Sequence, residues 1–169
     1  MGKLNKKVLI YGLALVLLIV LVGGTYLYLK SNPPLEIGTL VSDKEQPSVI
    51  VVIGNRGLSD IQIMDVAVNN HEDPTETKIQ MSNAMQGFTI LEDFEGPLAD
   101  EFDFVDISEA IIQTGTSPAE NLEKQNDGTA TEEDEVYGIS VRHDEEIHTV
   151  HIKYSYFGIS LFEEVEMPF

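Results

Sequence analysis

The chain has 169 residues, with 10 Lys and Arg against 29 Asp and Glu, and it contains neither Cys nor Trp. That length suits one domain with a tail. The apolar fraction of 43% is enough for a folded core, which excludes wholesale disorder. The absence of Cys excludes a disulfide scaffold, a thiolate zinc site, a cysteine nucleophile and a lipoprotein anchor.

The charge is unevenly distributed along the chain. Residues 1–30 contain four Lys and no acid, whereas residues 31–169 contain all 29 acids and six bases, a formal charge of −23. A surface this acidic repels phosphate backbones, so we expect no nucleic-acid partner.

An uncharged run over residues 8–29 predicts a transmembrane helix. Fourteen of its residues are Leu, Ile or Val. A helix of this length spans roughly 33 Å, against about 30 Å for the hydrocarbon core of a bilayer. Tyrosines lie near both ends of the run, at the levels where aromatic rings favour the membrane interface: Tyr11, Tyr26 and Tyr28.

Cations set the predicted orientation of this helix. More of them precede the run than follow it, so residues 1–7 should form a cytoplasmic tail and the rest should be extracytoplasmic. Cleavage near Gly24 would instead release a secreted protein. The apolar run continues to Leu29, however, beyond the usual length of a signal peptide, which favours an uncleaved single-pass signal anchor in the cell membrane. The lysines that precede the apolar run are Lys3, Lys6 and Lys7.

Residues 30–34 form a predicted linker, and residues 35–169 form one predicted extracytoplasmic domain. Short apolar runs separated by polar turns predict an all-β fold, an antiparallel sandwich. The expected strands cover residues 35–40, 49–53, 61–68, 87–91, 102–107, 136–142, 147–156 and 159–167.

Three local patterns refine this prediction. Gly54–Gly57 reads as a turn in which Asn and Gly take positive φ. His143–Glu146 reads as the polar loop of a hairpin between strands 136–142 and 147–156. In 61–68 the apolar phase changes, which indicates either a β-bulge near Ile63 or Met64 or a strand with both faces partly covered.

The segment 114–135 is predicted to be a long acidic loop. Within it, Ser117–Glu120 has the pattern of a capping box with Pro at the first helical position. A short helix is therefore expected from Pro118 to about Gln125, followed by a mobile loop.

The sequence offers weak candidates for metal binding. His148 and His151 should point to opposite faces of a strand, and His71 is far away in sequence, so the histidines read as surface or edge residues. Calcium prefers clustered carboxylates, but the acids around Gly128 lack the spacing of a calcium loop. No cofactor is therefore expected, and the weak calcium candidates are Asp127, Glu132, Glu133 and Asp134.

Catalytic motifs are missing from the sequence. It contains neither a nucleophile elbow for serine catalysis nor a glycine-rich phosphate loop before a helix. Carboxylate pairs arise by chance among 29 acids, so we expect no enzyme. Phe162 is out of phase with Leu161 and is expected to be exposed, like the terminal Phe169, where either could contact a partner.

Residues 49–57, followed by a strand that ends Val66-Ala67-Val68-Asn69, resemble immunoglobulin-like β-sandwiches of bacterial surface proteins. Residues 150–158 look like the penultimate strand of such domains. The layout as a whole is similar to that of a Gram-positive membrane-anchored protein. The resemblance implies a fold and a tendency to bind proteins or envelope components, and it transfers no functional residue.

These patterns favour a non-enzymatic, membrane-tethered binding or accessory module of the cell envelope. The bilayer would hold residues 8–29, and the partner would be a protein or the cell wall. A sensory or regulatory ectodomain that responds to a cation or ligand is the first alternative. A carboxylate-based envelope hydrolase is the second.

Overall fold

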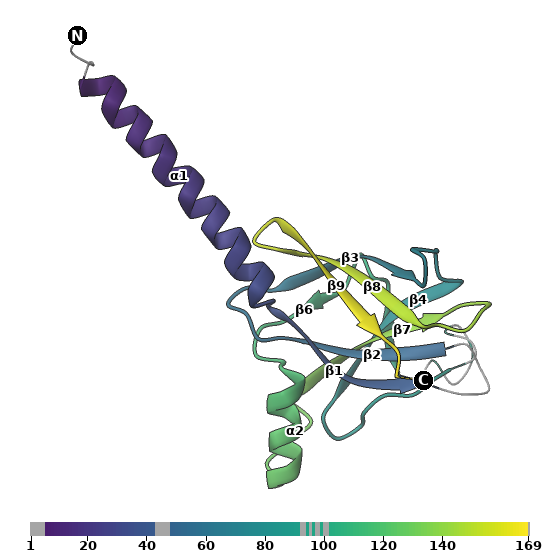
Figure 1. The fold of residues 1–169 in the computed structure, drawn as a ribbon. Helices are drawn as coiled ribbons and strands as arrows, with labels where there is room; N and C mark the ends of the chain where they lie inside the picture. The colour runs from purple at the N-terminus through teal and green to yellow at the C-terminus, as the bar shows by residue number, and fades with distance from the viewer. Residues whose placement is uncertain are drawn as a thin grey trace. The chain divides into compact units, whose positions relative to one another are not determined.

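A computed structural model describes residues 6–42, 48–91, 94, 96, 99 and 102–168. The chain divides into two compact units, Met1–Pro33 and Pro34–Phe169. The first unit contains α1 (Lys6–Ser31), which is long and apolar enough to cross a membrane (Figure 1). Apart from Leu29, its apolar side chains are exposed on all sides, as expected for a helix whose every face is apolar. The helix predicted over 8–29 is therefore present and extends two residues further at each end.

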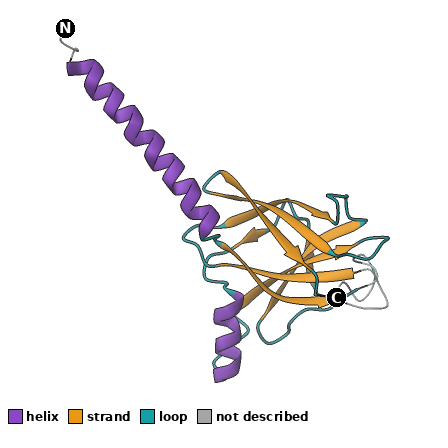
Figure 2. Ribbon diagram, viewed as in Figure 1, coloured by secondary structure: helices purple, strands orange, loops and turns teal. Residues whose placement is uncertain are grey.

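The second unit consists of two antiparallel sheets and one short helix (Figure 2). The five-stranded sheet has the order β1 (Leu35–Ser42), β2 (Ser48–Asn55), β7 (Glu135–Arg142), β4 (Glu76–Asn83) and β5 (Asp103–Val105). The four-stranded sheet has the order β6 (Ile111–Ile112), β3 (Ile61–Val68), β8 (Thr149–Tyr156) and β9 (Ile159–Glu166). The helix is α2 (Pro118–Asp127). The predicted antiparallel all-β architecture after an apolar helix is confirmed.

The core lies between the inner faces of the two sheets. Every second residue of β8 is buried, so the predicted alternation of a buried and a wet face is confirmed. The β2 strand is buried on both faces, which explains its uninterrupted run of β-branched residues. The largest fully buried side chains come from both sheets and include Ile53, Ile139, Ile63, Ile152 and Tyr154.

A β-bulge in β3 reconciles the two apolar phases of that strand. Ile63 pairs with Tyr154 and Asp65 pairs with Lys153, so Met64 is the extra residue. Ile61 and Ile63 before the bulge, and Val66 and Val68 after it, are all buried. The bulge predicted near Ile63 or Met64 is confirmed.

The predicted hairpin between residues 136–142 and 147–156 is wrong. The β7 strand belongs to the five-stranded sheet and β8 to the four-stranded sheet, so the His143–Glu146 segment crosses from one sheet to the other. Alternation of apolar residues shows which face of a strand is buried. The same alternation occurs when two successive strands share a sheet and when they face each other across a core, so it does not distinguish a hairpin from a crossover. The hairpin is instead β8–β9, whose two-residue turn has φ of 50° at Phe157 and 73° at Gly158.

Sequence periodicity missed β4 and wrongly predicted a strand over residues 87–91. The β4 strand is mostly polar, which hid it. Residues 87–91 lie over the outer face of the sheet instead of within it: the N–H of Thr89 donates to Gln80 Oε1 at 3.3 Å. The Phe88 ring packs against Gly138, where a Cβ atom would come within 3.0 Å of it. The strand expected over 102–107 is reduced to β5, and the two-residue β6 was not expected.

The turn at residues 54–57 also differs from its prediction. Neither Asn55 nor Gly57 has a positive φ. Asn55 closes the turn through its side chain, because the Gly57 N–H donates to Asn55 Oδ1 at 2.8 Å. Gly57 is needed for space, since a Cβ there would lie 2.9 Å from Pro34 and 2.7 Å from Tyr156 Oη.

Each sheet has two edge strands. The five-stranded sheet ends in β1 and the three-residue β5, and the four-stranded sheet ends in the two-residue β6 and in β9. The pairing of β1 with β2 is irregular between Ile37 and Leu40. Glu163 of β9 pairs with the buried Ile152 and therefore lies on the inner face, where burial raises the pKa of its carboxyl group against the opposing effect of Arg56.

Candidate functional site

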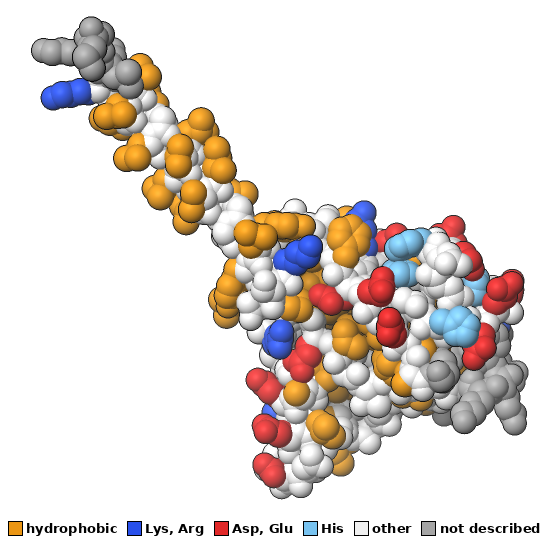
Figure 3. Space-filling model, viewed as in Figure 1, with side chains coloured by type: hydrophobic (Ala, Val, Ile, Leu, Met, Phe, Trp, Pro, Cys, Tyr) orange, Lys and Arg blue, Asp and Glu red, His pale blue; other side chains and the backbone are white. Residues whose placement is uncertain are grey.

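The candidate site is the outer face of β3, β8 and β9, which we call the open face. Its cross-strand rows are Asp65, Lys153 and Phe162, and next to them Ala67, His151 and Glu164. Together with the adjacent His71 they line a shallow depression of about 320 Å³. Figure 3 shows histidine and acidic side chains gathered on this side of the domain.

The outer face of the other sheet is covered. The α2 helix contacts β1 and β2, and Pro118 sits so close to Gly38 and Gly54 that a Cβ on either glycine would lie within 2.7 Å of its ring. By contrast, Phe162 on the open face keeps 69% of its surface exposed. The outer faces of the two sheets thus differ in coverage: α2 packs on one, and the other presents side chains to solvent.

His151 occupies the centre of the open face. Its Nε2 lies 2.7 Å from the Asn69 carbonyl oxygen, and its Nδ1 lies 3.3 Å from Glu164 Oε2. Both ring nitrogens therefore face oxygen atoms, one of the backbone and one of a carboxylate. The His71 ring stacks on it, with centroids 4.0 Å apart and planes at 30°. The fold therefore brings His71, which is far away in sequence, into contact with His151.

A tight turn after β3 brings His71 to this position. Asn69 and His71 have φ of 50° and 63°, and Val68 and Glu72 exchange two backbone hydrogen bonds across the turn. The Asn69 side chain holds the turn against the loop before β8, donating to the Glu146 carbonyl oxygen at 3.0 Å and accepting from the His148 N–H at 2.8 Å. The consecutive Asn69 and Asn70 are the sequence signal for this left-handed turn.

Lys153 and Phe162 form the apolar part of the open face. The Lys153 ammonium group lies 5.8 Å from the centroid of the Phe162 ring, within the range of a cation–π contact. The predicted exposure of Phe162 is confirmed. The other aromatic residue predicted to be exposed, Phe169, lies outside the described residues.

The remaining histidines lie at the same end of the domain as the His71 turn. His143 Nε2 is 3.3 Å from Glu72 Oε2. His148 precedes β8 and is not part of that strand. Within the described part of the chain, no group of three or more His, Asp or Glu side chains is arranged to hold a metal ion.

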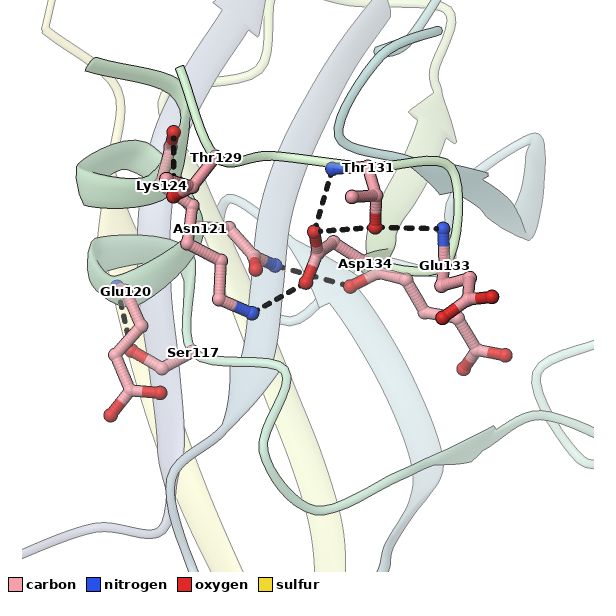
Figure 4. Close-up of polar contacts among 9 residues, drawn as sticks. Ser117, Glu120, Asn121, Lys124, Thr129, Thr131, Glu133 and Asp134 are labelled. Atoms are coloured by element: carbon pink, nitrogen blue, oxygen red, sulfur yellow. Dashed lines mark hydrogen bonds and ion pairs between the residues drawn. The ribbon is translucent and has the colours of Figure 1, made fainter. Parts of the chain in front are cut away.

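The weak calcium candidates lie at the end of α2 and in the segment after it; Figure 4 shows two of them, Glu133 and Asp134. Asp127 is the last residue of the helix, and Glu132 and Glu133 are exposed. Asp134 pairs with Lys124 and accepts hydrogen bonds from the N–H and the hydroxyl group of Thr131, at 2.8 and 3.0 Å. These donors, Lys124 foremost, lower the pKa of the Asp134 carboxyl group. Its oxygens are thus engaged in holding the chain, and calcium binding stays a prediction.

The same contacts define how α2 begins and ends and how the chain leaves it; the mobility expected for the segment after α2 stays a prediction. The helix begins as expected, with Ser117 Oγ accepting from the Glu120 N–H at 3.3 Å and Pro118 at the first position. It ends at Gly128, which has φ of 68°. The chain then folds back on the helix: the N–H groups of Thr129 and Ala130 both donate to the Lys124 carbonyl oxygen, at 2.9 and 3.1 Å.

The predicted membrane-flanking residues are found along α1. Lys6 and Lys7 are its first two residues. The three tyrosines are exposed on the helix surface, near the ends where they were expected: Tyr11, Tyr26 and Tyr28. Lys3 lies outside the described residues.

No protein-family model, curated protein or solved structure matches this chain.

Proposed function

We propose that the chain is a membrane-tethered, extracytoplasmic binding module that acts without catalysis and receives its partner on the open face. The tether is α1, whose 26 residues have a hydropathy suited to a bilayer. Three lysines precede the apolar run and one follows it, an asymmetry that favours a cytoplasmic N-terminus. The domain after it is a separate compact unit.

The observation that carries the proposal is the contrast between the two outer sheet faces. The five-stranded sheet is covered by an inserted segment of its own chain, whereas the open face exposes an aromatic side chain beside a depression. Exposed aromatic residues surrounded by polar groups are typical of the centres of protein interfaces.

The chemistry of the open face favours a specific, polar partner surface. Opposite charges are neighbours on this face: Asp65 is the cross-strand neighbour of Lys153, and Glu164 Oε2 lies 3.3 Å from His151 Nδ1. Cross-strand pairs of this kind fix the side chains in place before binding, which lowers the entropic cost of association. We infer a protein or cell-wall surface that covers Phe162 and hydrogen-bonds to the surrounding carboxylates.

We further infer that the sandwich is of the immunoglobulin-like type. The order β1-β2-β7-β4 corresponds to strands A-B-E-D of such a domain, and β3-β8-β9 corresponds to C-F-G. Residues 84–134 then form an insertion between the fourth and fifth strands. This correspondence of strand order supports the resemblance that the valine-rich segment 49–57 suggests.

Site-specific photo-crosslinking in cells tests the proposed binding face. A photoreactive amino acid is placed at Phe162 in the tagged full-length protein, and a matched variant carries it at Leu122, an exposed residue of α2 over the other sheet. After purification in detergent, mass spectrometry should identify one dominant adduct from position 162 and none from position 122. Equal adducts from both positions, or none from 162, would refute the open face as the binding surface.

A further inference from the structure

Two connections at one end of the domain carry exposed apolar side chains. Leu58, between β2 and β3, is 92% exposed, and Phe157, in the β8–β9 turn, is 67% exposed. Large apolar groups at loop tips contribute nothing to the core, and exposing them to water is unfavourable. We call Leu58 and Phe157 the apolar tips.

The apolar tips are held beside the first residue of the domain. The Leu58 N–H donates to Tyr156 Oη at 2.8 Å, and the Phe157 ring packs edge-on against the Tyr156 ring, 4.6 Å between centroids. On the same loop as Leu58, the Arg56 N–H donates to the Pro34 carbonyl oxygen at 3.0 Å. The two tips and Pro34 therefore belong to one rigid end of the domain.

Chain length brings this end of the domain to the membrane surface. The helix ends at Ser31, and two residues separate it from Pro34. Three extended residues reach at most about 11 Å. A 26-residue helix is about 39 Å long, which exceeds a hydrocarbon core of about 30 Å and ends among the headgroups. With α1 across a bilayer, Pro34 is therefore within about 11 Å of the headgroup layer.

We propose that Leu58 and Phe157 insert into the interfacial layer of the bilayer and hold the domain in a fixed orientation on the membrane. This inference rests on the proposed membrane anchoring. It gives a role to the two exposed apolar side chains on the connections beside Pro34, Leu58 and Phe157. Insertion of apolar side chains by roughly 5–10 Å is the usual depth for interfacial segments.

The distribution of charge agrees with this orientation. Acidic residues crowd the connections at the opposite ends of β3 and β8, where Glu72, Asp73 and residues 144–146 lie. An eight-residue strand places them about 26 Å from the apolar tips. The acids of α2 lie over the other sheet, because α2 packs on β1 and β2. The two connections that carry the apolar tips hold one base, Arg56, and one acid, Asp60, so an anionic lipid surface meets less negative charge there than at the opposite end.

The absence of Trp from the chain allows a direct test. Three single-tryptophan variants of the full-length protein are reconstituted into phosphatidylcholine–phosphatidylglycerol vesicles whose acyl chains are brominated near the headgroups or near their ends. Leu58→Trp reports on the tip and Leu17→Trp on the middle of α1. Phe162→Trp is the control, an equally exposed aromatic position about 16 Å further along β9.

The proposal predicts three different responses. Leu58→Trp should emit at shorter wavelength than Phe162→Trp and should be quenched most by bromines near the headgroups. Leu17→Trp should be quenched most by deep bromines, and Phe162→Trp should not be quenched. Phe157→Trp should behave like Leu58→Trp, which guards against an effect peculiar to one variant.

Each other outcome has a definite meaning. Quenching of Leu17→Trp without quenching at positions 58 and 157 would overturn the insertion of the tips and leave the anchor in place. A lack of quenching at Leu17→Trp would overturn the anchor and the inference with it. Equal quenching of Phe162→Trp would show that the domain lies on the membrane through its open face, which contradicts the proposed orientation.

Discussion

Replacing Asn55 by Ala should be among the most damaging single changes outside the apolar core. The side chain of Asn55 is fully buried and bonds to three backbone groups. It accepts from the Gly57 N–H at 2.8 Å, and its amide donates to the carbonyl oxygens of Ser59 and Ile112, both at 2.9 Å. These bonds close the β2–β3 turn and fasten β6, at the edge of the other sheet, to the end of β2.

The loss of unfolding free energy in Asn55→Ala follows from the number of hydrogen-bonding groups that it leaves without partners. Each hydrogen bond contributes about 1 kcal/mol net, and a buried carbonyl left unpaired costs about 1–3 kcal/mol. The Ile112 carbonyl is the buried acceptor of the set. The loss should therefore be about 3–4 kcal/mol out of a total stability of about 5–15 kcal/mol. For a domain of this size that corresponds to a fall in Tm of roughly 10 °C.

The assay is thermal and urea unfolding of the full-length protein in detergent, followed by circular dichroism of the β-sheet. Asn83→Ala is the matched control, because the Asn83 side chain accepts from two backbone N–H groups, of Met85 and Gln86, in an exposed turn. It should cost about 1 kcal/mol or less, since water replaces those bonds. Equal losses in the two variants would refute the reasoning that Asn55 is costly to remove because its partners are buried.

Three further changes test separate parts of the structure. Gly54→Ala should lower the stability by about 3 kcal/mol in the same unfolding assay, because its Cβ would collide with the Thr116 carbonyl oxygen and lie 2.6 Å from Pro118 Cδ. Ser117→Ala should destabilise α2 locally by about 1 kcal/mol through loss of the N-cap, seen as faster amide hydrogen exchange in α2. Glu163→Gln should raise Tm at pH 7, because burial raises the pKa of this carboxyl group and the folded state therefore prefers its neutral form.

The effect of Glu163→Gln on stability should depend on pH. The protonated form of Glu163 contributes its stability fully below the unfolded pKa of about 4.3 and loses it as the pH rises through the higher folded value. The gain from Gln should therefore vanish in acid. A lower Tm of Glu163→Gln at pH 7 would mean that attraction by Arg56 outweighs burial. If Gly54→Ala left the stability unchanged, the close approach of Thr116 to Gly54 would be contradicted. If Ser117→Ala changed amide hydrogen exchange equally throughout the domain, the local role of Ser117 in α2 would be contradicted.

Sequence periodicity predicted those elements whose burial follows a simple rule. Strand β8 alternates and β2 is buried on both faces, so both were predictable, and the phase change in β3 even located its bulge. Strand β4 was not, because it is mostly polar and its buried Gln80 bonds to a covering segment that no local pattern announces. The assignment of β7 and β8 to different sheets is likewise a property of the whole fold.

The candidate site was less predictable than the fold. The exposure of Phe162 followed from its phase in the strand. The stacking of His71 on His151 did not, because it joins residues 80 positions apart through a left-handed turn. The calcium candidates were selected by charge alone, and the structure gives Asp134 a different task, the ion pair with Lys124.

The edges of the two sheets bear on how many copies of this protein can share a membrane. Confinement to a surface raises the local concentration of a tethered domain, and open strand edges then favour sheet-to-sheet pairing between neighbours. Two of the edges, β5 and β6, are too short to template a partner strand. The irregular pairing of β1 with β2 bends the third edge. A strand from another copy that paired with the fourth edge, β9, would have to bury the carboxylate of Glu163. Crowded copies should therefore stay separate, and each domain should meet other molecules through its side chains rather than its backbone.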